Sequence, residues 1–331
     1  MPKVSVIMSV YREPIEWIDA SINSILEQTF KDFEFIIVDD NPESEELRQY
    51  LNIKARSDNR IVLITNHHNI GLTKSLNVAL SKANGEYIAR MDADDIASPN
   101  RFSKQVVYLE NNSEKSIVHC NYSLIDEKNT IIKQKYHSFK NFSLSYSVWN
   151  NPIAHSTVMF KTSLSSVRTP LYNEDYKSAQ DYELWAFLFL HTNVEIGYID
   201  EVLLNYRISG NQVSRTRNSE QINNAKTSRR LCIIAFMKKL KLIDNIEGFD
   251  IKYLFKELSN VNRTTIPQEM EWAYMHLLFL FYYNLASKSV FYALRYVCDK
   301  NKLVRYFGIK QSLFVLAHPF IDRGKWFLYK L

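Results

Sequence analysis

Short apolar runs alternate with amphipathic stretches along the first hundred residues of the chain. Residues 3–10, 33–38, 61–64 and 85–91 are rich in β-branched and other apolar side chains, which predicts four buried β-strands. Between them, residues 15–28, 43–54 and 72–83 place apolar positions at helical spacing. Strands that alternate with helices predict βαβ units, and therefore an α/β fold with a mostly parallel sheet.

The pattern is less regular in the rest of the chain. Residues 117–125 and 157–161 predict further strands, residues 181–190 a helix, and residues 194–198 and 202–206 two short strands. After residue 219 nearly the whole sequence is helical in pattern and rich in aromatic residues. We therefore expect one domain at 1–215 and a helical C-terminal region at 216–331, with the boundary in the polar stretch RTRNS.

Charge is distributed unevenly between these two parts. Residues 1–220 contain 23 Lys and Arg against 28 Asp and Glu, whereas residues 221–331 contain 18 against 8. A basic tail on an acidic body predicts an anionic partner, either a membrane or a nucleic acid. The final GKWFLYKL mixes cations with aromatic residues as membrane-surface segments do, which favours a membrane over nucleic acid. The alternative is a solvated helix end with core aromatic residues.

Cysteine usage and hydropathy bear on location. Cys120, Cys232 and Cys298 are far apart and odd in number, which favours a reducing cytoplasm over a disulfide framework. The N-terminal sequence enters a strand pattern directly, so we expect no signal peptide. The most apolar segment, residues 273–286, is shorter than the ~20 residues that a membrane span requires.

Polar side chains follow three of the predicted strands at the point where each strand ends. In open α/β sheets, ligands bind outside the carboxyl ends of the strands, so we expect these side chains to form one site. Asp92 and Asp94, one residue apart, can both turn toward a hard cation such as Mg²⁺ or Mn²⁺; a solvated acidic turn is the alternative. The three groups are Tyr11 to Glu13, Asp39 with Asp40, and Asp92 to Asp95.

The first two groups contain side chains suited to a nucleotide base. Tyr11 could stack on a flat base, or it could be an aromatic residue at the rim of the site. An aspartate at Asp39 or Asp40 could accept the imide N–H of uracil, a donor that cytosine lacks. The alternative for this pair is turn formation alone.

Several enzyme classes lack their defining motifs here. The chain has seven glycines and neither GxGxxG nor GxxxxGK, which argues against dinucleotide oxidoreductases and P-loop enzymes. It also lacks HExxH and GxSxG, which argues against zinc proteases and serine hydrolases of the α/β type.

The ordered motifs of residues 1–214 resemble those of the family 2 inverting glycosyltransferases. The resemblance implies a GT-A fold, which is a Rossmann-like sheet flanked by helices, together with a UDP-sugar donor and Mn²⁺ or Mg²⁺. It also implies a bacterial enzyme of surface-polysaccharide assembly. The matching segments are residues 4–11 (VSVIMSVY), 24–29 (SILEQT), 33–40 (FEFIIVDD), 69–72 (NIGL), 83–88 (ANGEYI), 90–95 (RMDADD) and 98–102 (SPNRF).

The resemblance also assigns roles to individual residues. Tyr11 and the Asp39–Asp40 pair become the base-recognition candidates, and we count Glu13, at the same strand end as Tyr11, with the nucleotide-binding residues. Asp92 is expected to contact the donor ribose or sugar, and Asp94 the metal. The remaining donor-side candidates, which could equally be scaffold charges, are Lys74 and Arg90.

A second acidic position is expected beside the acceptor. The family usually has Glu-Asp at the start of a helix, and here the matching pair is Gln180-Asp181. We expect Asp181 to be the catalytic base, with a low pKa set by the helix N-terminus, or alternatively to be only a first-turn acid. The segment from Asn151 to His155 resembles the acceptor-side loop, which makes His155 a weaker candidate. Ser209 stands where relatives often have histidine.

The implied reaction has one proton transfer. The cation stabilises the diphosphate leaving group, so the base need only deprotonate an acceptor hydroxyl for an inverting displacement. By resemblance, the acceptor is a lipid-linked oligosaccharide in O-antigen, capsule or exopolysaccharide synthesis, and the enzyme is peripheral at the cytoplasmic face of the inner membrane. The first rival is a sugar-1-phosphate nucleotidyltransferase, which should have a Gly/Arg-rich loop after the first strand, where this chain has YREP at residues 11–14. The second is a non-catalytic basic binding module, which would have no need of Asp94 and Asp181.

Overall fold

The computed structural model describes residues 1–135, 147, 151, 153–209 and 219–239. The chain divides into two units, one made of Met1–Phe142 with Asn151–Ser228, the other of Ser143–Asn150 with Arg229–Leu331. The helix α8 (Ser219–Lys239) holds the last residues of the first unit and most of the described residues of the second. Residues 215, 273–286 and 324–331, on which three of the expectations rest, lie outside the described residues.

A four-stranded parallel sheet forms the first half of the first unit. Its strands are β1 (Val4–Val10), β2 (Phe33–Asp39), β3 (Ile61–Thr65) and β4 (Tyr87–Arg90), in the order β3-β2-β1-β4. All four were predicted, and their ends differ from the prediction by at most two residues. Val10 pairs with Asp39, which pairs with Thr65, so the carboxyl ends of these strands share one edge of the sheet.

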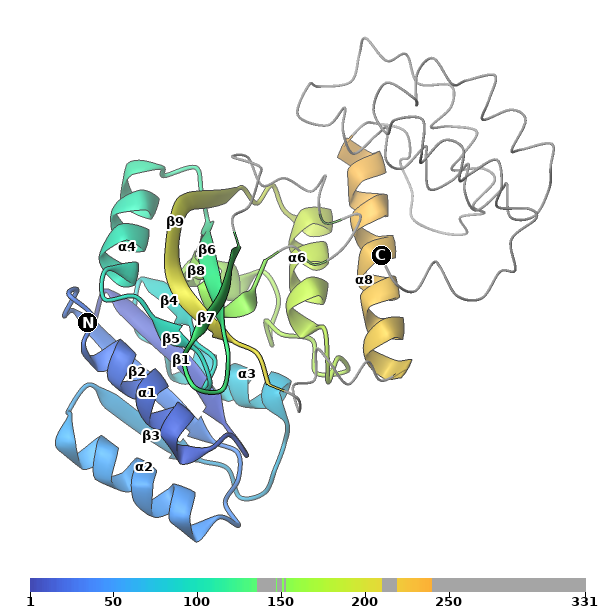
Figure 1. The fold of residues 1–331 in the computed structure, drawn as a ribbon. Helices are drawn as coiled ribbons and strands as arrows, with labels where there is room; N and C mark the ends of the chain where they lie inside the picture. The colour runs from blue at the N-terminus through green and yellow to red at the C-terminus, as the bar shows by residue number, and fades with distance from the viewer. Residues whose placement is uncertain (136–146, 148–150, 152, 210–218, 240–331) are drawn as a thin grey trace. The chain divides into compact units, whose positions relative to one another are not determined.

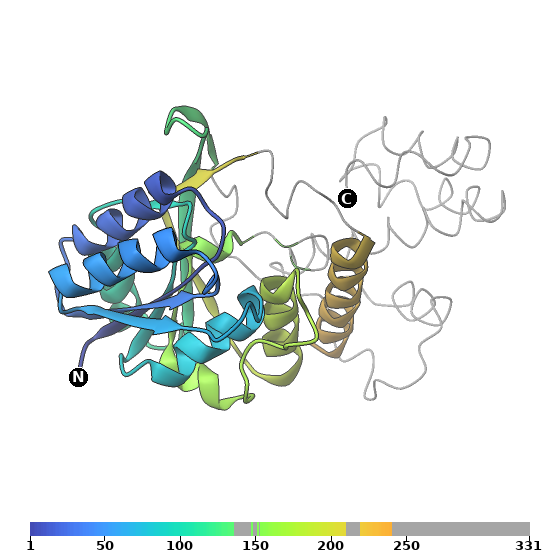
Figure 2. The same ribbon diagram turned by 90° about the horizontal axis from the view of Figure 1, so that it is seen from below.

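Three helices cover the two faces of this sheet. Figure 2 shows α1 (Ile15–Leu26) and α2 (Glu45–Ser57) on one face and α3 (Leu72–Lys82) on the other. On α1, the residues Ile18, Ile22 and Ile25 are fully buried, as their helical spacing predicts. The chain enters α3 through Gly71, whose φ of 87° is a conformation that glycine adopts readily.

The sheet continues beyond β4 with mixed strand directions. The order is β4-β8-β6-β9-β5, and β7 pairs with β6 outside this path (Figure 1). Of these neighbours, β6 and β9 are parallel, while the other pairs are antiparallel. The strands are β5 (Ile96–Ala97), β6 (Ile117–Ile125), β7 (Ile131–Lys135), β8 (Met159–Lys161) and β9 (Ile196–Arg207).

The main error in the strand prediction concerns β9. The prediction of two short strands at 194–198 and 202–206 is wrong, because one strand runs through both. Its register against β6 shifts in the middle, where Cys120 pairs with Ile199 and Asn121 with Val202. A bulge of this kind brings exposed polar residues into a strand, and here they resemble a turn in the sequence.

One helix of the first unit had no counterpart in the prediction. The helix α4 (Arg101–Asn111) buries Arg101 and Gln105 completely, together with Phe102 and Leu109. The Arg101 guanidinium donates to the carbonyl oxygens of Arg90 (2.8 Å) and Val158 (3.2 Å). Polar side chains on the inner face hide the helical periodicity, because the pattern assumes that buried positions are apolar. Within the described ranges, no helix has the length and apolar character needed to cross a membrane.

Candidate functional site

The acidic loop, residues 92–95, follows β4 at the edge where the parallel strands end. The main-chain oxygen of Asp92 accepts a hydrogen bond from Ser21 Oγ of α1 at 2.9 Å. The negative charge of Asp92 contributes to raising the pKa of both Glu13 and Asp181, after the larger effect of burial in each case. The structure therefore brings Glu13 and Asp181, which are 168 positions apart in the sequence, within electrostatic reach of Asp92.

Arg90 and Asp92 form an ion pair at the base of this loop. The Arg90 guanidinium donates to the Asp92 carboxylate and to the main-chain oxygen of Met91. The Arg90 side chain is 1% exposed, whereas that of Asp92 is 30% exposed. The ion pair fixes one oxygen of Asp92 and leaves the side chain accessible at the sheet edge. Arg90 is therefore positioned to hold this loop, and its predicted contact with the donor stays a prediction.

Asp94 and Asp95 have different environments although they are adjacent. The Asp95 side chain is fully buried and accepts hydrogen bonds from Ser156 Oγ and from the main-chain N–H of Arg207. Burial and the neighbouring charges of Asp94 and Asp92 raise the pKa of Asp95 well above its ordinary value. Asp94 is partly exposed. Asp95 thus has a structural role, and Asp94 is the one of the two that a ligand can reach.

The donor set of this loop suits a hard cation only in part. Within the described residues, no group of three or more His, Cys, Asp or Glu side chains comes close enough to hold a metal ion. Mg²⁺ is commonly bound by one or two protein carboxylates together with substrate phosphates and water. The acidic loop fits that second arrangement, with Asp94 as the accessible carboxylate.

The two carboxylates of the Asp39–Asp40 pair differ in how many of their oxygens are hydrogen-bonded. Each oxygen of the Asp40 carboxylate accepts two hydrogen bonds: Oδ1 from Asn66 Nδ2 and Ile70 N, and Oδ2 from Asn69 Nδ2 and Gly71 N, all at 2.8–3.1 Å. Asp39 Oδ1 accepts from the main-chain N–H of Asn41, but Asp39 Oδ2 is buried and has no partner. Burial raises the pKa of Asp39. The unused acceptor of the pair therefore belongs to Asp39.

The loop after β1 is held by its own carboxylate. Glu13 Oε2 accepts a hydrogen bond from the main-chain N–H of Tyr11 at 2.8 Å. The Tyr11 ring is partly exposed, and the Arg12 guanidinium lies 4.8 Å from its centre. Tyr11 thus presents an aromatic face near the strand ends, while Glu13 shapes the loop. Lys74 lies exposed in the first turn of α3.

Asp181 lies in the first turn of α6 (Gln180–His191), where its carboxylate is fixed at both oxygens. Oδ1 accepts from the main-chain N–H of Tyr182 at 2.8 Å, and Oδ2 accepts from Asn151 Nδ2 at 2.5 Å. Burial raises the pKa of Asp181 above its ordinary value, and these two hydrogen bonds only oppose that rise. The expectation of a low pKa is therefore wrong, because burial outweighs the helix N-terminus.

Asn151 is a site residue that the sequence did not identify as such. It stood in the loop motif that ends at His155, but nothing in the sequence indicated that it contacts a residue 30 positions later. The residue before α6 adds a second unexpected feature, because Ala179 has a left-handed conformation with φ 57°. Such backbone conformations are uncommon for alanine and are found at functional sites more often than elsewhere.

The two other acids near α6 have different surroundings. Glu183 is buried and accepts two hydrogen bonds from Arg168, at 2.6 and 2.8 Å. Asp175 is exposed in the turn before the helix. Neither acid shares the two hydrogen bonds that fix Asp181, from Asn151 and from the main chain of Tyr182.

His155 is buried beneath this part of the site. Its Nε2 lies 2.8 Å from Tyr172 Oη, and its ring meets that of Trp185 edge-on, with 6.1 Å between the ring centres. Burial and the nearby Arg90 cation lower the pKa of His155 well below its ordinary value, so the imidazole is neutral. These contacts join the loop before β8 to α6, and contact with an acceptor stays a prediction.

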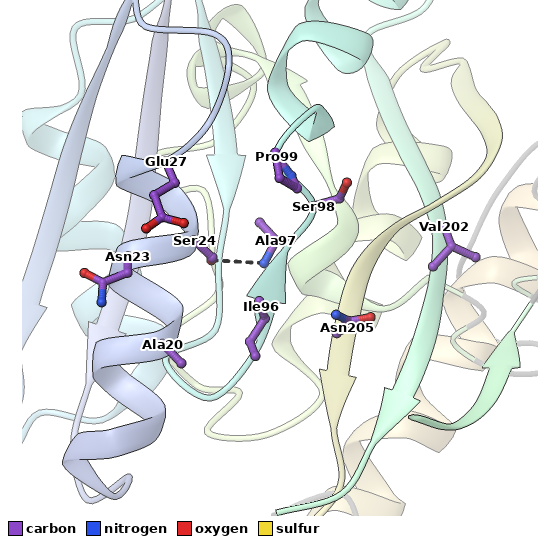
Figure 3. Close-up of a pocket in the computed structure, with 10 residues that line it drawn as sticks. All are labelled: Ala20, Asn23, Ser24, Glu27, Ile96, Ala97, Ser98, Pro99, Val202 and Asn205. Carbon is purple, nitrogen blue, oxygen red and sulfur yellow. Dashed lines mark hydrogen bonds between the residues drawn. The ribbon is translucent and has the colours of Figure 1, made fainter. Parts of the chain in front are cut away.

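A cavity of about 440 Å³ lies between α1, β5 and β9, beyond the acidic loop (Figure 3). None of the predicted site residues lines it. Two of its polar side chains have partners: the buried Ser24 Oγ accepts from Ala97 N at 3.0 Å, and the partly exposed Asn23 contacts Asp19 and Lys54. None of the residues that line the cavity has a buried side-chain oxygen or nitrogen atom without a hydrogen-bond partner.

Comparison with known proteins identifies the family. Residues 5–168 match the sequence profile described as Glycosyl transferase family 2. A glycosyltransferase of Haemophilus influenzae is 33% identical over 81% of this chain and 85% of its own length. The chain belongs to glycosyl transferase family 2.

Further relatives agree with this assignment. The glycosyltransferase is 34% identical to the O-antigen biosynthesis glycosyltransferase WbnJ of Escherichia coli, over 64% of this chain and 82% of that protein. Residues 1–349 of S. aureus TarS, solved with UDP-GlcNAc, align with a TM-score of 0.59 at 18% identity, covering 95% of this chain and 90% of that one. The expected GT-A fold and glycosyltransferase class are confirmed, and the nucleotidyltransferase and non-catalytic alternatives are set aside.

Proposed function

We propose that this glycosyltransferase transfers a sugar from a UDP-sugar to an acceptor hydroxyl with inversion, and that it requires Mn²⁺ or Mg²⁺. The observation that carries the proposal is the position of Asp181. Its carboxylate is held at both oxygens, and its charge interacts with Asp92 of the acidic loop. A carboxylate fixed close to a candidate donor site is what a single-displacement transfer requires.

The donor part of the proposal rests on the strand ends. The partly exposed ring of Tyr11 suits stacking against a base, and the unpaired Oδ2 of Asp39 suits the imide N–H of uracil. Asp40 would shape the pocket by holding residues 66–71. The solved complexes of TarS with UDP and with UDP-GlcNAc support the same nucleotide for this chain.

A bound divalent cation would supply charge stabilisation for the departing diphosphate. Asp94, the accessible carboxylate of the acidic loop, would hold it together with oxygens of the donor. Arg90 and Asp92 would fix the loop and contact the donor sugar or ribose, with Lys74 near the diphosphate. Asp181 would accept the proton of the acceptor hydroxyl as that oxygen attacks the donor, so an α-linked donor gives a β-linked product.

The decisive experiment is a screen of UDP-sugars for UDP release that depends on the enzyme, with and without Mn²⁺. We expect slow release from one donor in the presence of Mn²⁺ even without an acceptor, because water can replace the acceptor hydroxyl. If UDP is released at the same rate in the presence of EDTA as in the presence of Mn²⁺, the metal requirement is contradicted. An absence of binding to UDP and to every UDP-sugar would contradict the donor class.

Asp39→Asn is expected to weaken UDP binding by about tenfold or more. The substitution keeps the shape of the side chain, but it can place an N–H₂ group against the imide N–H of uracil, and two facing donors leave a buried polar group unpaired. Isothermal titration with UDP and with CDP measures the effect. An equal loss of affinity for UDP and CDP, or no loss of affinity for UDP, would show that Asp39 does not recognise the base.

The acceptor and location are proposed from the relatives and the charge distribution. The role of WbnJ in O-antigen biosynthesis supports a lipid-linked oligosaccharide as acceptor, reached from the cytoplasmic face of the inner membrane.

The excess of Lys and Arg in residues 221–331 supports contact with anionic lipid. We expect binding to phosphatidylglycerol vesicles that weakens as salt rises and after deletion of residues 324–331. If the protein with residues 324–331 intact does not bind such vesicles at low salt, the proposal of membrane contact is wrong.

A further inference from the structure

Arg207 ends β9 as a fully buried cation beside the acidic loop. A buried arginine is costly unless its charge is balanced and its N–H groups are paired. The side chain therefore needs partners at this point of the fold, and those partners come from segments that are distant in the sequence.

The first set of partners belongs to the acidic loop. Arg207 Nε donates to the main-chain oxygen of Asp94 at 2.8 Å, and the main-chain N–H of Arg207 donates to Asp95 Oδ1 at 2.9 Å. One residue thus fixes the backbone at Asp94 and the side chain at Asp95. These two hydrogen bonds also place its positive charge beside the two adjacent acidic residues of the loop.

The second set of partners belongs to the turn between β6 and β7. Arg207 Nη1 donates to the main-chain oxygen of Asp126 at 2.9 Å, and Nη2 donates to Asn129 Oδ1 at 2.6 Å. The Trp17 ring lies 4.9 Å from the guanidinium carbon. The pairing of Ile125 with Arg207 in neighbouring strands brings this turn to the end of β9. The planar guanidinium therefore joins the acidic loop to a turn that is closed by its own hydrogen bonds, in a geometry that lysine cannot reproduce.

We propose that Arg207 is a positioning residue for the cation site: it anchors the Asp94 main chain to the β6–β7 turn and thereby sets where the Asp94 carboxylate meets a divalent cation. The proposal rests on the proposed function, since it assumes that Asp94 binds the cation. Groups that orient metal ligands typically change metal affinity by 10–100-fold when they are altered. An unanchored Asp94 would have to be ordered at the moment the cation binds.

The test is direct Mn²⁺ binding to the UDP-bound protein, measured by the EPR signal of free Mn²⁺. Arg207→Lys is expected to weaken Mn²⁺ binding by about tenfold, while UDP affinity without metal stays near that of the wild type. Arg60→Lys is the matched control, because Arg60 also bridges two segments, Asp58 and the Leu26 carbonyl, and stacks on Phe33. Arg60 lies just before β3, at the opposite edge of the sheet, so its substitution should leave Mn²⁺ affinity unchanged.

A second variant covers the case in which Arg207→Lys does not fold. Asn129→Gly removes the acceptor of Nη2, and glycine suits the φ of 66° at this exposed turn position. We expect a severalfold loss of Mn²⁺ affinity. Wild-type affinity in both folded variants would overturn the role of Arg207 and leave the proposed function intact. Failure of the wild-type protein itself to bind Mn²⁺ would overturn the metal assignment and this inference with it.

Discussion

Asp181→Asn is expected to lower the rate of sugar transfer by about 10²-fold or more, while the affinities for UDP and Mn²⁺ stay nearly unchanged. Asparagine keeps the shape of the side chain and can still accept the N–H of Tyr182, but it cannot take a proton from the acceptor. Single-turnover transfer and UDP titration separate the two effects. Asp175→Asn, at an exposed acid of the preceding turn, is the control and should transfer at the wild-type rate.

The outcome also distinguishes a base from a helix cap. Asparagine is nearly as good as aspartate at a helix start, so a capping role would leave turnover intact. If Asp181→Asn transfers sugar at the wild-type rate, Asp181 is therefore not the catalytic base. Equal losses of UDP binding and transfer would mean that Asp181 acts on the donor and not as the base.

The pH dependence of the same reaction provides an independent check. Only the ionised carboxylate can accept a proton, so transfer should fall as the pH drops through the pKa of Asp181, which burial raises above its ordinary value. Asn151→Ala removes a hydrogen bond that favours the ionised form, so the acidic limb of the profile should move to higher pH. Asn77→Ala is the control, since Asn77 contacts the carbonyl of Tyr172 instead.

Asp94→Ala is expected to abolish Mn²⁺-dependent binding and turnover of the UDP-sugar while the protein stays folded. Asp94 is the accessible carboxylate of the acidic loop, and a hard cation needs oxygen ligands. Thermal unfolding and UDP-sugar titration with and without Mn²⁺ give the two readouts. Asp32→Ala, at an exposed acid before β2, should change neither. Undiminished Mn²⁺-dependent turnover in folded Asp94→Ala would show that the cation is held elsewhere.

Asp95→Ala provides a contrast at the adjacent position. The buried carboxylate of Asp95 joins Ser156 to the main chain of Arg207, so its removal leaves two buried donors unpaired. We expect a lower unfolding temperature for this variant than for Asp94→Ala. This result would show that Asp94 contributes mainly to ligand binding and Asp95 mainly to the stability of the fold.

The sequence by itself determined the first half of the fold and the edge of the sheet at which the candidate site residues lie. The β-branched runs at β1 to β4 and the helical spacing of Ile18, Ile22 and Ile25 are local signals, because each reflects burial on one face of one element. Parallel strands share a carboxyl edge, so the acids that follow them could be placed together without coordinates. The same ordered motifs carried the family resemblance.

Only the tertiary structure decided which of these residues are available to a ligand. Asp39 and Asp40 look alike in the sequence, as do Asp94 and Asp95, but the donors that occupy Asp40 and Asp95 come from other parts of the chain. The contacts of Asn151 with Asp181, and of Arg207 with the acidic loop, likewise join residues 30 and 113 positions apart. Hydrogen bonding and burial at such separations depend on how the strands are ordered in the sheet, and no periodicity along the chain records that order.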